Sequence, residues 1–226
     1  MFSESVIKSL ASASWIRAMF EQGAQLKKKY GEENVFDFTL GNPDPEPPEA
    51  VQESIKKYLS VPGIHKYMAN AGYEDVRQKV ASYTKSKTGI DINYKDVMMA
   101  SGAAGGLNAV LKALLNPGEE VIVITPFFSE YASYIANFNG TLVKVPSIPG
   151  TFQLDVDLIE KALTSKTKAI IINSPNNPSG AVYTEESLIK LSRILKNWEK
   201  QTGTPVYVLS DEPYSKLVYD NLKIRR

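Results

Sequence analysis

The chain has 226 residues and a formal net charge of +1, from 26 Lys and Arg against 25 Asp and Glu. Both charge signs are spread along the chain, so we expect neither a nucleic acid nor an anionic membrane as a partner. The absence of cysteine excludes disulfides and thiolate nucleophiles, and the single histidine, His65, argues against a histidine-based metal site or a Ser-His-Asp triad. No apolar run approaches the ~20 residues that span a bilayer. The N-terminus lacks the pattern of a signal peptide, so we expect a cytoplasmic protein.

The N-terminal part of the chain is predicted to be helical around a proline-rich connector. Apolar residues recur at helical spacing over residues 3–30, and a basic run, Lys27–Lys29, complements the dipole at the end of this helix. Residues 41–48 contain four prolines, which helix and sheet interiors both exclude. We therefore predict a domain boundary near residue 45, followed by helices over residues 48–59 and 73–87.

From residue 97 onward, apolar runs of strand length alternate with stretches of helical periodicity. Strands are predicted at residues 97–101, 121–125, 141–145, 169–173 and 206–210, and helices at residues 107–115, 129–137, 156–163 and 185–198. This alternation predicts an α/β fold with a mainly parallel sheet and helices on both faces. Ligands of such sheets bind beyond the carboxyl ends of the strands.

The stretch from Asp96 to Leu115 combines a predicted strand, a loop of small residues and a helix. The loop, residues 101–106, has the sequence Ser-Gly-Ala-Ala-Gly-Gly, and small residues let a backbone turn sharply and approach a ligand closely. Free N–H groups and the positive end of the helix dipole favour a phosphate at this position. A turn that uses small residues only for close packing is the alternative, and this stretch alone leaves both interpretations open.

The loops after three further strands carry aromatic or polar residues. Phe128 offers an aromatic face on which a flat ring can stack, whereas Phe127 is better explained as a core residue. Asn177 lies in a proline-fixed loop, where such residues are also common turn formers. Asp211 is a carboxylate at a strand end, which requires a cation or a strong donor. Tyr214 offers a hydrogen-bonding phenol beside it.

Together, these loops offer an anion site, a stacking aromatic, an amide, a carboxylate and a phenol. Pyridoxal 5′-phosphate has the complementary groups, namely a phosphate, a flat ring, a hydroxyl and a basic ring nitrogen. The residues therefore predict a site for this cofactor. A dinucleotide is the weaker alternative, because no Gly-x-Gly-x-x-Gly motif follows a predicted strand.

From about Trp15 to Tyr219, the chain resembles the class I/II aminotransferases, which are fold-type I pyridoxal-phosphate enzymes. Six motifs in the family's order carry the resemblance: Leu-Gly-Asn-Pro-Asp at 40–44, Tyr67 followed by Gly72, Ser-Gly-Ala-Ala at 101–104, Pro-Phe-Phe at 126–128, Asn-Asn-Pro-Ser-Gly at 176–180 and Asp-Glu-Pro-Tyr at 211–214. No single motif is specific, whereas the ordered set is.

The resemblance implies a role for each residue at the strand ends. Three residues are expected to hold the cofactor phosphate: Gly102, Ala103 and Ala104. Phe128 is expected to stack on the ring, and Asn177 and Tyr214 to bind the ring hydroxyl oxygen. Asp211 is expected to pair with the ring nitrogen, so Asp211 and Tyr214 are the expected catalytic residues of this chain.

The resemblance also implies a homodimer and a domain division. Tyr67 is expected to reach the phosphate of the cofactor in the neighbouring subunit, and Gly41 to lie near the substrate carboxylate. Residues 1–45 are expected to be part of a small domain. Residues 46–226 are expected to form the large cofactor-binding domain, incomplete at its C-terminus.

The chain departs from the family pattern at its C-terminal end. The family's Schiff-base lysine lies beyond the Asp-x-x-Tyr motif, and the chain ends before such a segment, while Lys216 and Lys223 lie too close to Tyr214 for this role. The family's substrate-binding C-terminal arginine also lies further on, as do the two strands that in the family lie between residues 97–101 and the other four strands. We therefore expect the N-terminal portion of a longer enzyme, inactive alone, in which residues 97–101 lack a sheet partner.

The function that the resemblance implies is amino transfer between an L-amino acid and a 2-oxo acid, with an aspartate-like enzyme as the expected type. C–S β-lyases and cyclopropane-carboxylate synthases share these motifs and are alternatives. A non-catalytic cofactor-binding protein is a further alternative, because the lysine is missing from the chain.

Overall fold

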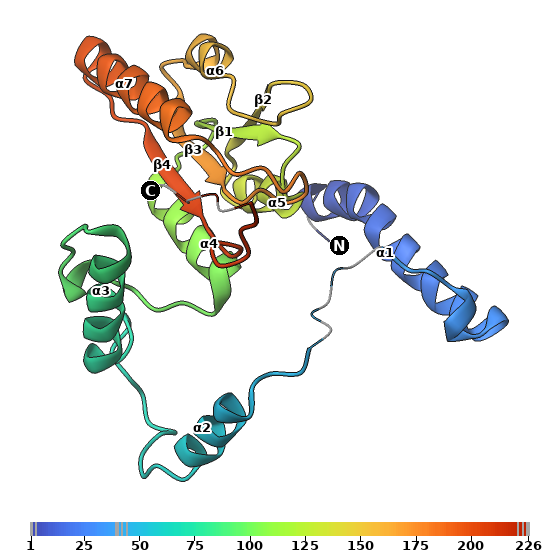
Figure 1. Ribbon diagram of the computed structural model, residues 1–226. Helices are drawn as coiled ribbons and strands as arrows, with labels where there is room; N and C mark the ends of the chain where they lie inside the picture. The colour runs from blue at the N-terminus through green and yellow to red at the C-terminus, as the bar shows by residue number, and fades with distance from the viewer. Residues whose placement is uncertain are drawn as a thin grey trace. The chain divides into compact units, whose positions relative to one another are not determined.

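The computed structural model describes residues 2, 4–38, 41, 43, 45–220, 222 and 224. The chain forms two compact units, Met1–Tyr67 and Met68–Arg226, and Figure 1 shows their helices and strands. The first unit contains the helices α1 (Glu4–Tyr30) and α2 (Glu49–Leu59) and the short helix η1 (Glu32–Asn34). The division into a small and a large domain near residue 45 stays a prediction.

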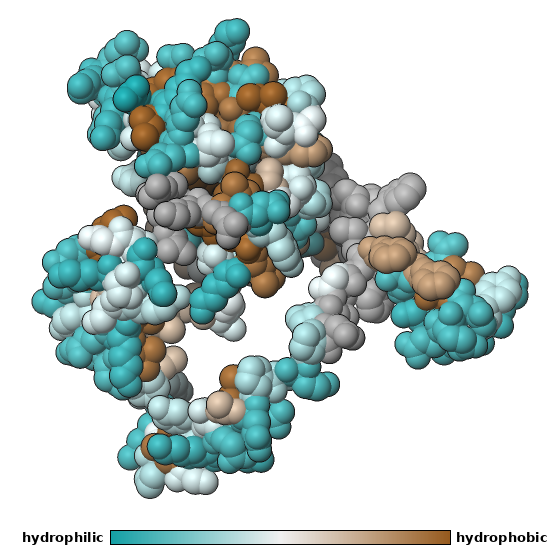
Figure 2. All heavy atoms as spheres, viewed as in Figure 1, coloured by the Kyte–Doolittle hydropathy of each residue, from teal (hydrophilic) through white to brown (hydrophobic). Residues whose placement is uncertain are grey.

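The helices of the first unit agree with the predicted ranges. α1 ends in the basic run Lys27–Lys29, which complements its dipole. α2 places Val51, Ile55 and Leu59 on one face, where they remain 47%, 57% and 75% exposed. Figure 2 shows apolar residues of this kind interrupting a largely polar surface. No helix in the described part of the chain is both long and apolar enough to cross a membrane.

The second unit contains the sheet. Its helices are α3 (Glu74–Thr88), η2 (Tyr94–Asp96), α4 (Gly102–Leu114), α5 (Glu130–Ala136), α6 (Val156–Ala162) and α7 (Glu185–Thr202), and its strands are β1 (Glu120–Thr125), β2 (Thr141–Pro146), β3 (Thr167–Asn173) and β4 (Tyr207–Asp211). Side-chain caps explain two helix starts: Asp155 accepts a hydrogen bond from the Leu158 N–H in α6, and Thr184 caps α7 in the same way.

The four strands form one parallel sheet in the order β2-β1-β3-β4. β1 and β3 are central, and the register pairs Asn173 at the end of β3 with Asp211 at the end of β4. The predicted α/β fold with a parallel sheet is therefore confirmed, and four of the five predicted strands are present within a residue or two of their expected ends.

Side chains of the central strands alternate between two cores. One core joins the sheet to α6 and α7 and includes Ile122, Ile170, Ile159, Leu191 and Ile194. The other core joins the sheet to α4 and α5 and includes Val121, Val123, Ile171, Leu111, Tyr131 and Ile135. Helices therefore cover both faces, as Figure 1 shows, which explains why β1 and β3 are continuous apolar runs.

Residues 97–101 do not form the predicted strand. Their backbone is held instead by the preceding segment, because the Met99 N–H donates to the Ala71 carbonyl at 3.0 Å and Arg77 Nε donates to the Val97 carbonyl at 2.7 Å. Within the described residues, no strand lies beside them to form a ladder. The apolar run has a strand pattern, but a strand exists only when a neighbour pairs with it.

The predicted loop of small residues is also helical. α4 begins at Gly102 rather than at Leu107, so residues 102–106 form its first turns. Ala103 and Ala104 have the highest helix propensity, and a Cβ atom placed on Gly105 or Gly106 would meet only the Ala100 Cβ, at 3.9 and 3.8 Å. The helix start therefore lies on the residues that were expected to bind phosphate, where the Gly102 N–H donates to the Ala100 carbonyl at 3.0 Å and the next N–H groups, of Ala103 and Ala104, have no partner within the helix.

Hydrogen exchange tests whether residues 97–101 lack a strand partner, as they do within the described part of the chain. We expect the amides of residues 97–101 to exchange at least about tenfold faster than those of residues 121–124, because only the latter belong to a buried ladder. Mass spectrometry of peptides after brief labelling at neutral pH measures both segments in one sample. Equal protection of the two segments would show that residues 97–101 pair with a strand after all.

Candidate functional site

The carboxyl ends of three strands gather at one edge of the sheet. β1, β3 and β4 run parallel, so they end together at Thr125, Asn173 and Asp211. α4 runs alongside the sheet in the opposite direction (Figure 1), since a short turn joins its C-terminal end to the start of β1. Its 13 residues span about 20 Å, about the length of a six-residue strand. The first turn of α4 therefore lies at the same edge.

Asp211, at the end of β4, is held by a tyrosine from α5. The Tyr131 hydroxyl donates a hydrogen bond to Asp211 Oδ2 at 2.5 Å. Tyr131 is only 2% exposed, and Asp211 is half-buried. Leu209, two residues before Asp211, packs in the core that contains Tyr131. The Asp211 carboxylate therefore emerges on the α4–α5 face of the sheet.

Three phenols of the second unit, those of Tyr131, Tyr134 and Tyr183, stay neutral at neutral pH. Burial raises the pKa of the Tyr131 hydroxyl far above its usual value, and the hydrogen bond to Asp211 raises it further. Burial also raises the pKa of the neighbouring Tyr134, and it raises the pKa of Tyr183 to about 12. Tyr131 is consequently a neutral donor toward Asp211 over the whole physiological range.

A buried asparagine joins β3, β4 and the loop that follows β3. Asn173 is 4% exposed. Its Nδ2 donates to the Asp211 carbonyl oxygen at 2.9 Å, and its Oδ1 accepts from the Asn177 N–H at 2.6 Å. One side chain thus uses its donor and its acceptor to fix both the end of β4 and the start of the loop.

The loop after β3 is closed by its own hydrogen bonds. Asn176, which is 7% exposed, accepts hydrogen bonds from the Ser179 N–H at 3.1 Å and from the Ser179 hydroxyl at 2.8 Å. The Tyr183 N–H donates to Ser174 Oγ at 2.9 Å. Because these bonds lie within the protein, the position of Asn177 is set before any ligand binds.

Three of the predicted cofactor residues lie close together: Asp211, Asn177 and Phe128. Asp211 and Asn177 share Asn173 as a hydrogen-bonding partner. The Phe128 ring meets the Tyr131 ring edge to face, with centroids 5.6 Å apart and planes at 85°. Tyr131 thereby connects Phe128 to Asp211, and Phe127 packs against the same core, in agreement with its expected structural role.

The remaining predicted residues of the second unit are exposed. Gly102, Ala103 and Ala104 form the first turn of α4, and a Cβ atom placed on Gly102 would meet no atom within 4 Å. Tyr214 lies in the turn after β4 with 37% of its surface exposed. Among the described residues, no hydrogen bond joins Tyr214 to Asp211.

Two predicted residues belong to the first unit. Tyr67 is fully exposed, and Gly41 is exposed with open space around it. Of the two lysines weighed from the sequence, Lys216 is exposed and its ammonium lies 5.8 Å from the centroid of the Tyr83 ring. Lys223 lies outside the described residues.

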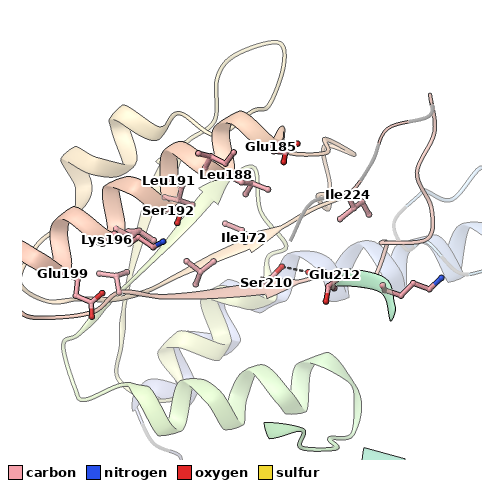
Figure 3. Close-up of a pocket in the computed structure, with 16 residues that line it drawn as sticks. Ile172, Glu185, Leu188, Leu191, Ser192, Lys196, Glu199, Ser210, Glu212 and Ile224 are labelled. Carbon is pink, nitrogen blue, oxygen red and sulfur yellow. Dashed lines mark hydrogen bonds between the residues drawn. The ribbon is translucent and has the colours of Figure 1, made fainter. Parts of the chain in front are cut away.

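A pocket of about 720 Å³ lies on the opposite face of β4 (Figure 3). Its lining includes Leu188, Leu191 and Ser192 from α7, together with Ile172, Ser210 and Glu212. The Ser210 hydroxyl donates to Glu212 Oε1 at 2.8 Å. Neighbouring residues in a strand point to opposite faces, so this pocket and the Asp211 carboxylate lie on different sides of the sheet.

Two residues of this network were not identified from the sequence: Tyr131 and Asn173. Asn173 is recognisable in retrospect as the polar residue that follows the apolar run at residues 169–172. Tyr131 carries no comparable signal, because a tyrosine in an amphipathic helix is usually a core residue. Its partner lies 80 residues away in the sequence, which no local pattern reveals.

Known proteins match most of this chain in sequence. The profile of the aminotransferase class I and II family matches residues 33–225. A probable aspartate/prephenate aminotransferase of Thermus aquaticus is 31% identical over 215 residues, covering 95% of this chain and 54% of that protein. A probable N-acetyl-LL-diaminopimelate aminotransferase of Bacillus subtilis is 36% identical over 191 residues, covering 83% of this chain and 46% of that protein.

Solved structures agree with these relatives. An amino transferase from Eubacterium rectale superposes with a TM-score of 0.92 at 36% identity, over 100% of this chain and 58% of that chain. Aspartate aminotransferase from Thermus thermophilus with maleate superposes with a TM-score of 0.80 at 30% identity, over 92% of this chain and 53% of that chain. The chain thus spans about half the length of these relatives. Their names do not favour the lyase, synthase or non-catalytic alternatives.

A single-atom change tests the role of Asn173. Asn173→Asp keeps the acceptor for the Asn177 N–H but replaces the donor to the Asp211 carbonyl by an oxygen. We expect the free energy of unfolding to fall by about 1–3 kcal/mol at neutral pH, measured by urea denaturation. The loss should shrink as the pH falls, because burial favours the protonated carboxyl, which again has a donor.

Asn93→Asp is the matched control. The exposed Asn93 side chain acts as an acceptor from the Lys95 N–H at the start of η2, a role that a carboxylate retains. We expect its unfolding free energy to stay within about 0.5 kcal/mol of the parent chain. Equal stability of the two variants would show that the Asn173 donor contributes nothing to the end of β4.

Proposed function

We propose that this chain, which belongs to the class I and II aminotransferase family, binds pyridoxal 5′-phosphate and takes part in amino transfer between an L-amino acid and a 2-oxo acid. Enzymes of this family depend on that cofactor. The observation that carries the proposal is Asp211, a half-buried carboxylate held at the carboxyl end of β4 by Tyr131 and Asn173. Such a carboxylate is suited to a cationic ring nitrogen.

The donor set at this edge of the sheet fits the cofactor. The first turn of α4 offers the positive end of a dipole and the N–H groups of Ala103 and Ala104 to the phosphate, while the Gly102 N–H donates to the Ala100 carbonyl at 3.0 Å, so that Gly102 would contribute its small size. The small residues of this turn leave the approach open, as the empty space around Gly102 indicates. Phe128 offers a half-buried ring for stacking. Asn177 offers its amide to the ring hydroxyl oxygen, with Tyr214 as a second donor to the same atom.

Asp211 has the central chemical role in this proposal. When bound, the cofactor with a protonated ring takes up the electron pair released as the substrate Cα–H bond breaks. The Asp211 carboxylate holds the proton on the ring nitrogen, because a negative charge at this position favours the cationic ring. Tyr131 and Asn173 support this role by fixing the side chain and the backbone of Asp211, respectively.

We also propose an aspartate-like substrate range, with Gly41 near the substrate carboxylate. The support is the set of names among the relatives, which include a probable aspartate/prephenate aminotransferase of Thermus aquaticus and an aspartate aminotransferase of Pyrococcus abyssi. Formation of oxaloacetate from L-aspartate and a 2-oxo acid by the whole protein decides this assignment. Release of ammonia and pyruvate from a cysteine derivative, without amino transfer, would favour a lyase instead.

We further propose a cytoplasmic homodimer in which Tyr67 completes the phosphate site of the neighbouring subunit. The exposure of Tyr67 supports this proposal, since a fully exposed tyrosine ring is available for a contact outside its own unit. The uncovered apolar face of α2 is a second support, because apolar faces of helices are normally buried against another surface.

Binding of pyridoxamine 5′-phosphate tests the cofactor site without the need for a covalent link. We expect the chain to bind this molecule in equilibrium dialysis, and Asp211→Ala to weaken binding by about tenfold or more, because it removes a charged hydrogen bond. Asp157→Ala is the control, since Asp157 is exposed and pairs with Lys190 on the surface. Unchanged binding by Asp211→Ala would refute the assignment, and absence of binding by the parent chain would refute the site.

Mixed dimers test the shared site. We expect Tyr67→Phe to weaken binding of pyridoxamine 5′-phosphate, because it removes a phenol that contacts the phosphate. A mixture of Tyr67→Phe and Asp211→Ala chains should regain a tight-binding fraction, because each mixed dimer has one site that carries neither substitution. We also expect light scattering to give a mass of twice the chain's 25.0 kDa. A monomer, or a mixture that binds no better than its components, would contradict the shared site.

A further inference from the structure

The hydrogen bond from Tyr131 to Asp211 leaves the carboxylate with one oxygen engaged and one available. Tyr131 reaches Oδ2 from α5, across 80 residues of sequence. Among the described residues, Oδ1 accepts no hydrogen bond, and no lysine, arginine or histidine forms an ion pair with Asp211. The phenol therefore binds one side of the carboxylate and leaves the other side at the edge of the sheet.

A neutral donor suits this position better than a cation. A lysine or arginine in place of Tyr131 would form an ion pair with Asp211 and compensate its charge. Tyr131 forms a hydrogen bond but adds no charge, since burial keeps its phenol protonated. The nearest aromatic neighbours of Tyr131 are also neutral, namely Phe128 and Tyr134. The negative charge of Asp211 therefore remains available to a ligand.

The same bond limits the rotation of the carboxylate. The terminal torsion of an aspartate is broad, so a half-buried carboxylate without a partner samples many orientations. Tyr131 is buried in the core between α5 and the sheet, and its ring cannot follow such a rotation. A rigid donor on Oδ2 consequently fixes the direction in which Oδ1 points.

We propose that Tyr131 is a positioning residue, whose hydroxyl orients the Asp211 carboxylate so that Oδ1 meets the ring nitrogen of the cofactor. The inference rests on the function proposed above and extends it to a residue that does not touch the cofactor ring nitrogen. A purely structural Tyr131 would stabilise the fold and would leave the pairing of Asp211 with the ring unchanged.

The test uses pyridoxamine 5′-phosphate labelled with nitrogen-15 in its ring, bound to the full chain at neutral pH. In the parent protein, we expect the ring-nitrogen signal at the position of a protonated ring. In Tyr131→Phe, we expect the signal to move toward the position of an unprotonated ring, because the carboxylate is no longer held against the nitrogen. Phenylalanine keeps the buried ring and its apolar contacts, so α5 retains its packing.

A double-mutant cycle separates positioning from packing. We expect Tyr131→Phe to weaken binding of pyridoxamine 5′-phosphate about tenfold in the parent chain and by less than about twofold in Asp211→Ala, where no carboxylate remains to be oriented. A loss through packing alone would be the same factor in both backgrounds, and that result would overturn the proposal.

Tyr134→Phe is the matched control. Tyr134 lies on the same helix, and its ring centroid is 6.4 Å from that of Tyr131. We expect parent-like affinity and a parent-like ring-nitrogen signal. If the parent chain binds with a protonated ring but Tyr131→Phe behaves like Tyr134→Phe, the role of Tyr131 is refuted and the cofactor site stands. If the parent chain does not bind pyridoxamine 5′-phosphate at all, the proposed function itself is refuted.

Discussion

The hydrogen bonds on Asp211 are the constraint on which the candidate site depends. A carboxylate that is half-buried at the end of a strand must be satisfied from within the protein or by a ligand. Here the protein satisfies the backbone through Asn173 and one carboxylate oxygen through Tyr131. These partners come from β3 and α5, so the site exists only where the parallel sheet and its covering helix are both formed.

Hydrogen bonds and ring contacts within the protein fix the shape of the candidate site before a ligand is present. Asn173 connects Asp211 to Asn177, and the loop around Asn177 is closed by bonds among its own residues. Phe128 is positioned by its contact with Tyr131. A ligand that enters such a site spends little of its binding free energy on ordering side chains, and this is the usual source of tight binding by a small number of contacts.

Much of the fold could be predicted from the sequence because its signals are local. The apolar runs of β1 and β3 indicate strands buried on both faces. The position of Asp211 directly after the predicted strand at residues 206–210 indicates the functional edge. The strand predicted at residues 97–101 failed for a non-local reason, since pairing depends on a neighbour rather than on the run itself. Tyr131 escaped prediction for the same reason, because its role depends on a partner in a distant strand.

The absence of a strand at residues 97–101 leaves the proposed anion site at the start of α4 in place. α4 is anchored by its own packing, since Leu111 is fully buried against the sheet and Asn108 accepts a hydrogen bond from Asn137 in the turn after α5 at 3.1 Å. The contacts of Asn108 and Leu111, in the middle of α4, therefore position the first turn of this helix, and the segment before the helix is not needed for this. The proposed phosphate site and the Asp211 carboxylate consequently share one support, the core between the sheet and the helices α4 and α5, and we expect any change that loosens this core to act on both.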